Sequence, residues 1–422
     1  MATPQTIKLS PKAYHPFSQS LLDDYTERFP EAFANQTKEI QKLKGYVARA
    51  NLLGVQGPLG SGKTTLLTHF SYEYLATLGP VIYLQLASES FARPFSQIAL
   101  AVLKNCAKGN IKLASGHGIK VDDEIKRLEG ELQKQVGLKF EFKPEVDVAN
   151  VVKASIGGIS TEDIKSHAVQ QYDDDAALDF LSELIQHVDT LFYVILDDFH
   201  YFRRNFEDKD YYADFVRFSE KIQRVLRRRK VKFIITLDDL VLKKRKEAEA
   251  NGGGRAFRYT DRDLYIKGFT ADGVAEIIHR RLKLFDYSND PKPEFTDECV
   301  ILTSQASSGN PRLILDILAT AMEYADEEGS VRVGLDHTLD AILEETGTMF
   351  LDEVEIRILE VIAELGGKAL AKQFDKSVGS QTTIYERLRN LVKRGILVEK
   401  KTGTESRAPK NYEFTAVQWP DS

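Results

Sequence analysis

A glycine-rich stretch, Gly57-Pro-Leu-Gly-Ser-Gly-Lys63-Thr64, constrains the fold of this chain more than any other feature. Its spacing, two glycines around four residues followed by a lysine and a hydroxyl residue, is that of a phosphate-binding loop. Residues 52–55 are apolar and predict a short buried strand before the loop, and residues 65–70 predict the first turns of a helix after it. A plain glycine-rich turn is the alternative, but such a turn requires neither the strand nor the helix.

The residue types of the loop suit the binding of a nucleotide. Gly57, Gly60 and Gly62 allow the backbone to curl so that its N–H groups point at phosphate oxygens, and the helix N-terminus adds positive potential. Lys63 brings a charge to the outer phosphates, and Thr64 offers its hydroxyl to Mg²⁺. We therefore expect ATP and Mg²⁺ as cofactors. The residues expected to bind the nucleotide are Gly57, Pro58, Leu59, Gly60, Ser61, Gly62, Lys63, Thr64 and Thr65.

Two acidic residues end a second apolar run. Residues 191–196 are apolar, with β-branched and aromatic side chains that predict a buried central strand, and Asp197 and Asp198 follow directly. Carboxylates are costly to bury without a partner, and beside a phosphate-binding loop the partner is Mg²⁺. We expect Asp197 to hold the metal through water and Asp198 to polarise the attacking water. The alternative is that both residues only cap the following helix.

A third buried strand is predicted over residues 231–237, with Thr236 near its end. We expect Thr236 to sense the terminal phosphate or to orient water beside the acidic pair. A basic helix over 215–229 precedes this strand. Its cations form either a solvated face or a surface for a protein or nucleic-acid partner.

Composition limits the remaining possibilities. The 422 residues suffice for two or three domains, and the net charge of −6 excludes nucleic-acid binding over the whole surface, so such binding needs a local patch. Cys106 and Cys299 lie far apart, which argues against a disulfide framework or a zinc site and for a reducing compartment. There is no apolar run of transmembrane length and no signal-peptide pattern, so we expect a cytoplasmic protein without a membrane partner.

The order of patterns predicts an α/β P-loop core with a parallel sheet, followed by an all-helical lid and a C-terminal winged helix. The expected parts are an N-terminal arm packed on the core with a helix starting near Phe33 (1–45), the core (46–267) with an insertion (about 107–170), the lid (268–348) and the winged helix (349–422).

Further elements are predicted within the core and its insertion. The insertion contains a charged helix, an alternating strand-like segment and a Gly-Gly turn. The expected helices are 91–106, 120–135, 176–188 and 240–250, and the expected strands are 80–86, 136–142 and 264–266.

The predicted lid begins after Gly268, where the apolar pattern takes a period of 3.6 residues. Pro311 stands at the start of one of its helices, where its missing N–H costs nothing. Arg312 follows in the first turn, in position to reach a nucleotide phosphate. An ordinary surface arginine is the alternative.

The last segment predicts three helices, over 353–365, 368–374 and 380–394, and a two-stranded wing. Between Lys368 and Tyr412 there are eleven Lys and Arg against four Asp and Glu, a local excess that suits a phosphate backbone. A winged helix that packs only on protein is the alternative. The residues expected to contact double-stranded DNA are Thr382, Thr383, Tyr385, Arg389, Lys393, Arg394, Lys400 and Lys401.

Together, these motifs resemble the AAA+ ATPases over about residues 30–415, most closely the archaeal-type origin recognition and Cdc6-like group. In this resemblance Thr236 takes the sensor 1 position, and Ser308-Gly-Asn-Pro-Arg312 looks like sensor 2. Arg255 or Arg258 falls where the family places an arginine finger, which implies a homo-oligomer or a partner protein. Phe33 to Glu39 resembles the helix that contacts adenine, with Gln36 in place of the usual Arg.

The pair Asp197-Asp198 departs from the Asp-Glu usual in that family and is commoner in the STAND signalling ATPases. Two functions are therefore expected. One is a slow ATP-hydrolysing switch that binds DNA through its winged helix in replication initiation, mobile-element targeting or genome defence. The other is a STAND-like signalling ATPase whose winged helix packs on protein. A metabolic kinase would leave the lid, the wing and Arg312 unused.

Overall fold

The structure is a computed structural model of the whole chain. The residues that it describes are 15–17, 33–34, 37–58, 60–85, 94–116, 118–136, 142–148, 151–156, 175–197, 211–226, 230–237, 243, 247, 260–288, 291–375, 377–401 and 410–420. The chain divides into two compact units. One comprises residues 36–59 and 63–266, and the other comprises residues 1–35, 60–62 and 267–422.

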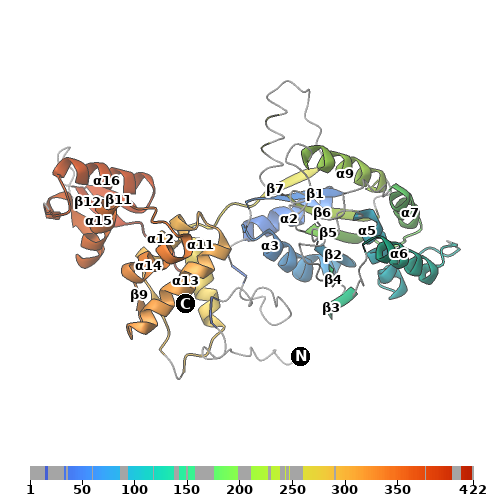
Figure 1. Cartoon of the computed structure of the whole chain (residues 1–422), viewed down its shortest axis with the longest axis horizontal. Coiled ribbons are helices and arrows are strands. Elements are labelled where there is room, and N and C mark those ends of the chain that lie inside the picture. Colours follow the sequence, from blue (N-terminus) through green and yellow to red (C-terminus); the bar gives the residue numbers. More distant parts are fainter. Residues whose placement is uncertain are drawn as a thin grey trace. The chain divides into compact units, whose positions relative to one another are not determined.

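The first unit is built around a seven-stranded sheet in the order β3-β4-β2-β5-β6-β1-β7 (Figure 1). The strands from β4 to β7 in this order run parallel, and β3 is antiparallel to β4. The strands are β1 (Leu52–Gln56), β2 (Val81–Gln85), β3 (Phe142–Val148), β4 (Val151–Ile156), β5 (Phe192–Asp197), β6 (Val231–Leu237) and β7 (Arg262–Tyr265). The parallel core predicted from the sequence is confirmed.

Helices cover both faces of this sheet, as a parallel sheet buried on both sides requires. They are α2 (Thr37–Arg49), α3 (Lys63–Phe70), the π-helical turn η2 (Ser71–Leu75), α4 (Ala76–Leu78), α5 (Pro94–Ala107), α6 (Val121–Val136), α7 (Asp175–Gln186) and α9 (Tyr211–Leu226). The helix expected near Phe33 begins only at Thr37, and Phe33 and Ala34 are not helical. Of the helix expected over 240–250, only the helical residues Lys243 and Glu247 lie in the described part.

Side chains alternate between the two faces of the central strands. On β5, Val194 and Leu196 belong to the apolar cluster that also contains residues of α5, α7 and α9. The residues between them face the other way. Lys232 on β6 donates a hydrogen bond to the Val47 carbonyl of α2, and burial, then the neighbouring Tyr74 of η2, raise the pKa of Tyr193 on β5. The second face is therefore the one that α2 and the α3–η2 helix cover.

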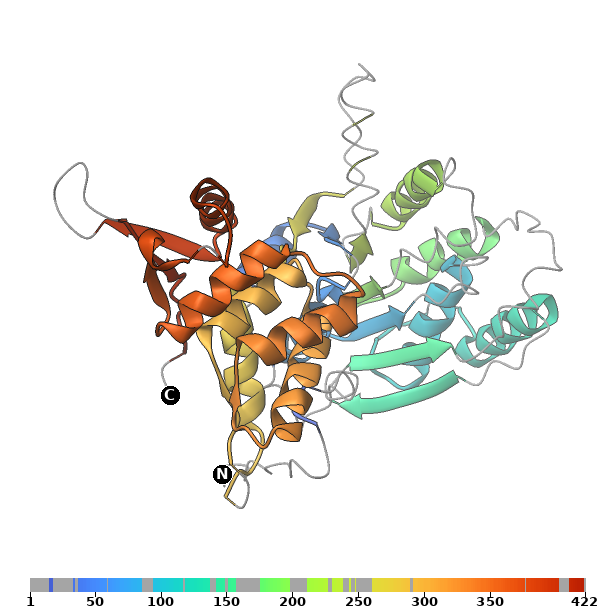
Figure 2. The same cartoon turned by 60° about the vertical axis from the view of Figure 1, so that its left-hand side comes forward.

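The segment 107–170, predicted as an insertion, extends the main sheet. β4 pairs with β2 in parallel, and β3 pairs with β4 in antiparallel register, so both strands lie at the sheet's edge (Figure 2). The strand predicted over 136–142 is wrong in position, because α6 continues to Val136 and β3 starts at Phe142. The edge of β2 offers unpaired backbone groups, and β4 satisfies them.

The second unit contains the helical lid. Its helices are α11 (Ala271–Lys283), α12 (Asp297–Ala306), α13 (Pro311–Glu327) and α14 (Leu335–Thr346), and two short parallel strands, β8 (Glu294–Phe295) and β9 (Arg332–Val333), join its loops.

The described part of the N-terminal arm packs in this lid and not on the sheet core, which corrects the prediction. Phe17 is 1% exposed and makes an edge-to-face contact with Phe295, with ring centroids 5.4 Å apart. Arg281 Nη1 donates to the Pro16 carbonyl at 3.0 Å. An apolar ring and a guanidinium that needs an acceptor thus fix the arm to the lid.

The C-terminal segment folds as a winged helix with α15 (Glu353–Glu364), α16 (Gln381–Lys393), β10 (Lys368–Leu370), the 3-10 turn η6 (Ala371–Gln373), β11 (Leu397–Lys401) and β12 (Lys410–Phe414). Of the short helix predicted over 368–374, only the 3-10 turn η6 forms, and residues 368–370 are a strand instead. Gly366 and Gly367 take positive φ angles of 77° and 86° after α15, and the chain then pairs as β10 with β12. The wing consequently has three strands, in the order β10-β12-β11.

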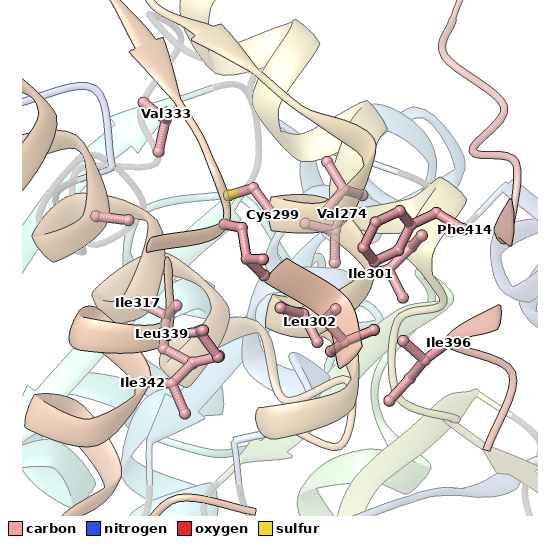
Figure 3. Packing of buried hydrophobic residues seen from close by; sticks show 14 of the residues in the cluster. Val274, Cys299, Ile301, Leu302, Ile317, Val333, Leu339, Ile342, Ile396 and Phe414 are labelled. Atoms are coloured by element: carbon pink, nitrogen blue, oxygen red, sulfur yellow. The ribbon is translucent and has the colours of Figure 1, made fainter. Parts of the chain in front are cut away.

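The lid and the winged helix share one apolar core. Figure 3 shows lid residues such as Val274 and Leu302 together with Ile396 and Phe414 of the winged helix, and all belong to one cluster of buried residues. The chain end after the wing also returns to the lid. The backbone N–H of Gln418 donates to Asp272, and Trp419 Nε1 donates to Asp297, both at 2.9 Å.

Candidate functional site

The glycine-rich loop has the backbone expected of a phosphate cradle. Gly60 and Gly62 have φ angles of 79° and 83°, a region that other residues rarely adopt. Gly57 does not have a positive φ angle; it is buried directly after the end of β1. Helix α3 begins at Lys63, so its first N–H groups and the positive end of its dipole lie directly after the loop.

Two polar side chains of the loop are buried. Lys63 is 9% exposed, and its ammonium donates to the carbonyls of Gly57 and Pro58, each at 2.8 Å. Ser61 is 2% exposed, and its hydroxyl oxygen has no hydrogen-bond partner among the described residues. A buried hydroxyl without a partner is costly, and a phosphate oxygen would satisfy it. The loop therefore fits a bound phosphate group.

The register of the strands brings Asp197 and Thr236 to the carboxyl ends of the strands, the end of the sheet at which the phosphate loop follows β1. β6 lies between β1 and β5, with Val55 paired to Thr236 and Leu196 paired to Ile235. Asp197 is the residue after Leu196, so Asp197 and Thr236 lie level at the carboxyl ends of adjacent strands. Because β6 lies between β1 and β5, these two strands are two strand spacings apart, about 10 Å.

Asp197 and Thr236 also project from the correct face of the sheet. Thr236 is four residues after Lys232 on β6, and Asp197 is four residues after Tyr193 on β5, so strand alternation places all four on the face covered by α2 and the α3–η2 helix. Asp197 and Thr236 are each 1% exposed. The Asp197 carboxylate and the Thr236 hydroxyl thus lie buried on the face of the sheet that is covered by α3, the helix that follows the phosphate loop.

The donor set fits Mg²⁺ as ATP-dependent enzymes hold it. No group of three or more His, Cys, Asp or Glu side chains that could hold a metal occurs in the described part of the chain. Mg²⁺ commonly takes one or two protein oxygens and completes its shell with water and substrate phosphates. Asp197 and the exposed hydroxyl residue Thr64 are the side chains that would hold it.

Several predicted site residues lie outside the described part of the chain: Leu59, Asp198, Arg255 and Arg258. Their roles stay predictions.

The predicted sensor 2 segment forms a tight turn in the lid. Ser308 and Gly309 both have positive φ angles, of 50° and 72°, and Asn310 caps helix α13 by accepting from the Arg312 N–H at 3.0 Å. Arg312 is exposed in the first helical turn, and Pro311 occupies the first position, as predicted. The turn also contacts the start of the lid, because the Phe269 N–H donates to the Gly309 carbonyl at 2.8 Å.

The predicted DNA-binding residues fall into two groups. Thr382, Tyr385, Arg389 and Lys393 are exposed and recur at spacings of three and four along α16, so they share one face of the helix. Thr383, beside them, is half-buried and hydrogen-bonds the capping Ser380.

The second group contacts other parts of the winged helix. Arg394 donates to Glu355 at 3.2 Å and lies over the Phe350 ring, and Lys400 pairs with Glu413 at 2.5 Å. Lys401 ends β11. Arg394 therefore already stabilises the domain itself.

Sequence reasoning missed one residue of this site. The Tyr83 hydroxyl on β2 donates to Asp197 Oδ2 at 2.5 Å. No motif surrounds Tyr83, and only its place in an apolar strand beside β5 signals this contact.

The fold and the loop define a class: a P-loop α/β core followed by a helical lid and a winged helix. No protein-family model matches the chain, and no curated protein sequence matches it. The chain is similar to several solved structures, among them the ORC1 protein of Aeropyrum pernix in complex with DNA. The two chains are 14% identical over 93% of this chain and 92% of that chain, with a TM-score of 0.40.

Two other solved structures are similar over comparable lengths. The ORC2 protein of Aeropyrum pernix has 16% identity over 94% of this chain and 93% of that chain, with a TM-score of 0.41. A Walker-type ATPase of Pyrococcus abyssi has 16% identity over 94% and 97%, with a TM-score of 0.40. Among the helices that the structure describes, none has the length and apolar character needed to cross a membrane.

Proposed function

We propose that this protein is an ATP-binding and ATP-hydrolysing switch that acts on double-stranded DNA. The proposal rests on one observation: Asp197 and Thr236 lie on one face of the sheet, at the carboxyl ends of their strands, and the phosphate loop begins at the carboxyl end of β1. Nucleotide binding would change the arrangement of lid and core, and hydrolysis would reset it.

Residues of the loop bind the phosphates, and residues at the carboxyl ends of the strands act on the metal and the water. The backbone N–H groups after Gly60 and Gly62 and the ammonium of Lys63 bind the phosphates. To do so, the ammonium gives up its hydrogen bonds to the Gly57 and Pro58 carbonyls and donates to phosphate oxygens instead. Thr64, through its hydroxyl, and Asp197, through water, would hold Mg²⁺, which when bound would supply positive charge to the outer phosphates. Thr236 orients water near the terminal phosphate.

Three further roles rest on the family resemblance. Asp198 is the residue that polarises the attacking water, and a shorter acid at that position agrees with slow turnover. Arg312 supplies a cation from the lid. Arg255 or Arg258 enters a neighbouring subunit's site, which makes the active form a homo-oligomer or a complex with a partner protein.

Nucleotide binding is tested with a fluorescent ATP analogue. Lys63→Ala removes charge-assisted hydrogen bonds worth about 1.5–3 kcal/mol, so affinity should fall roughly 10- to 100-fold. Lys44→Ala, a change of the same charge on α2, is the control. Unchanged affinity in Lys63→Ala would contradict the site. Asp198→Asn should bind ATP and hydrolyse it more slowly.

For DNA, the proposal rests on the exposed face of α16. Arg389 and Lys393 lie on it, and the winged helix has a local excess of positive charge. Labelled duplex should bind with a steep salt dependence. Reversing both charges, Arg389→Glu and Lys393→Glu, should abolish binding, whereas reversal of Arg280 and Arg332 in the lid, an equal change of net charge, should leave much of it.

One observation favours the second function, a STAND-like signalling ATPase. The winged helix shares its apolar core with the lid, and Trp419 of the chain end bonds to Asp297 of α12. A winged helix used only for this packing would bind no duplex at low salt, and the titration above separates the two functions.

A further inference from the structure

The buried carboxylate of Asp197 is held by a residue from the neighbouring strand. Tyr83 is 3% exposed and Asp197 is 1% exposed. The tyrosine hydroxyl donates to Asp197 Oδ2 at 2.5 Å, a length within the range of hydrogen bonds from a hydroxyl to a carboxylate. Both side chains are therefore shielded from water, and Asp197 lies at the end of the sheet where the phosphate loop begins.

The pairing of the strands produces this contact. Tyr83 on β2 is the register partner of Ile195 on β5, and Asp197 lies two residues further along the same face. A diagonal pair of this kind is within reach of a long aromatic side chain but not of a short one. The phenol of Tyr83 thus spans one step of the strand to meet the carboxylate.

We propose that Tyr83 is a positioning residue for Mg²⁺ binding: its hydrogen bond fixes the carboxylate plane of Asp197 and thereby the direction in which its oxygens meet the metal. The proposal rests on the proposed function, because it assigns Asp197 to the metal. A carboxylate to which a fixed donor is bound loses less freedom when it holds an ion, so the tyrosine strengthens Mg²⁺ binding without touching the nucleotide.

The chain offers a matched control. Tyr193 on β5 is 2% exposed and lies on the same face as Tyr83. Its hydroxyl has no described bond to Asp197. Tyr83→Phe and Tyr193→Phe each delete one buried hydroxyl from the same layer, and only the first deletes the donor to Asp197.

The experiment measures binding of a fluorescent ATP analogue to the full chain, first with EDTA and then with increasing Mg²⁺. In EDTA, Tyr83→Phe, Tyr193→Phe and the native protein should bind alike. With Mg²⁺, the half-saturating Mg²⁺ concentration should rise roughly tenfold or more for Tyr83→Phe and stay unchanged for Tyr193→Phe. Equal Mg²⁺ dependence in the two variants would overturn the proposal, and so would tighter Mg²⁺ binding by Tyr83→Phe.

Two further outcomes are separable. If the native protein binds no nucleotide with or without Mg²⁺, the proposed function fails, whereas normal binding with identical variants refutes Tyr83 alone. Should Tyr83→Phe not fold, 3-fluorotyrosine at position 83 keeps the ring and the hydroxyl but makes the donor more acidic. It should shift the Mg²⁺ dependence, and the same substitution at position 193 should not; no shift at either position would overturn the proposal.

Discussion

Replacement of Gly309 by alanine tests the turn that precedes Arg312. Gly309 has a φ angle of 72°, and a Cβ added there would lie 2.4 Å from the Phe269 nitrogen and 2.5 Å from its oxygen. These are backbone atoms, which cannot rotate away as a side chain can. The turn must therefore shift, and the hydrogen bond from Phe269 to the Gly309 carbonyl is lost with it.

The structure provides a control for the cost of the backbone angle alone. Gly329, after α13, has a φ angle of 69°, and a Cβ there would meet nothing within 4 Å. A left-handed angle costs an alanine about 1 kcal/mol, which is the whole effect expected for Gly329→Ala. Gly309→Ala adds about 1 kcal/mol for the lost hydrogen bond and a similar amount for the displaced backbone, about 3 kcal/mol together.

The assay is thermal unfolding of the two variants followed by circular dichroism. For a unit of this size, 1 kcal/mol corresponds to about 2–4 °C, so Gly309→Ala should melt about 4–8 °C below Gly329→Ala. Equal melting temperatures would refute the argument that close backbone packing, and not the angle, makes glycine necessary at position 309.

Three other predictions concern the second unit. Ser380→Ala removes the cap that accepts the Thr383 N–H of α16 and should cost about 1 kcal/mol by chemical denaturation; an unchanged midpoint would contradict the capping role. Burial lowers the pKa of His15 from its ordinary 6.5, so the unfolded chain binds more protons there and stability is lost as pH falls below about 6.5. Melting temperatures of His15→Gln should therefore fall less between pH 7.5 and 5.5 than those of the native protein, and parallel curves would argue against this. Trp419 is the single tryptophan of the chain and donates to Asp297, so Asp297→Ala should increase quenching of its fluorescence by acrylamide, and unchanged quenching would show that the chain end is held by other contacts.

Signals within a few residues of each other allowed accurate prediction of the local elements. The apolar run before Asp197, the capping Ser380 and the described part of the loop all form the structures expected of them. Each depends on groups close in sequence: glycines that accept positive φ, apolar residues in one run, or a hydroxyl beside the N–H that it caps.

Errors arose where a segment depends on a distant partner. Residues 368–374 have a helical composition, yet the first three become β10 because β12, more than 40 residues later, offers an edge to pair with. The segment 107–170 carries no signal that its strands join the main sheet beside β2. Phe17 and its neighbours likewise gave no indication that they pack in the lid.

The sequence by itself determined that a phosphate loop, two strand-end acids and a basic winged helix occur in one chain. Only the tertiary structure decided that β6 stands between β1 and β5, that Thr236 and Asp197 share a face, and that Tyr83 holds the carboxylate. The physical reason is that strand order and register are set by hydrogen bonds between segments that are distant in the sequence, and no local pattern of side chains encodes that choice.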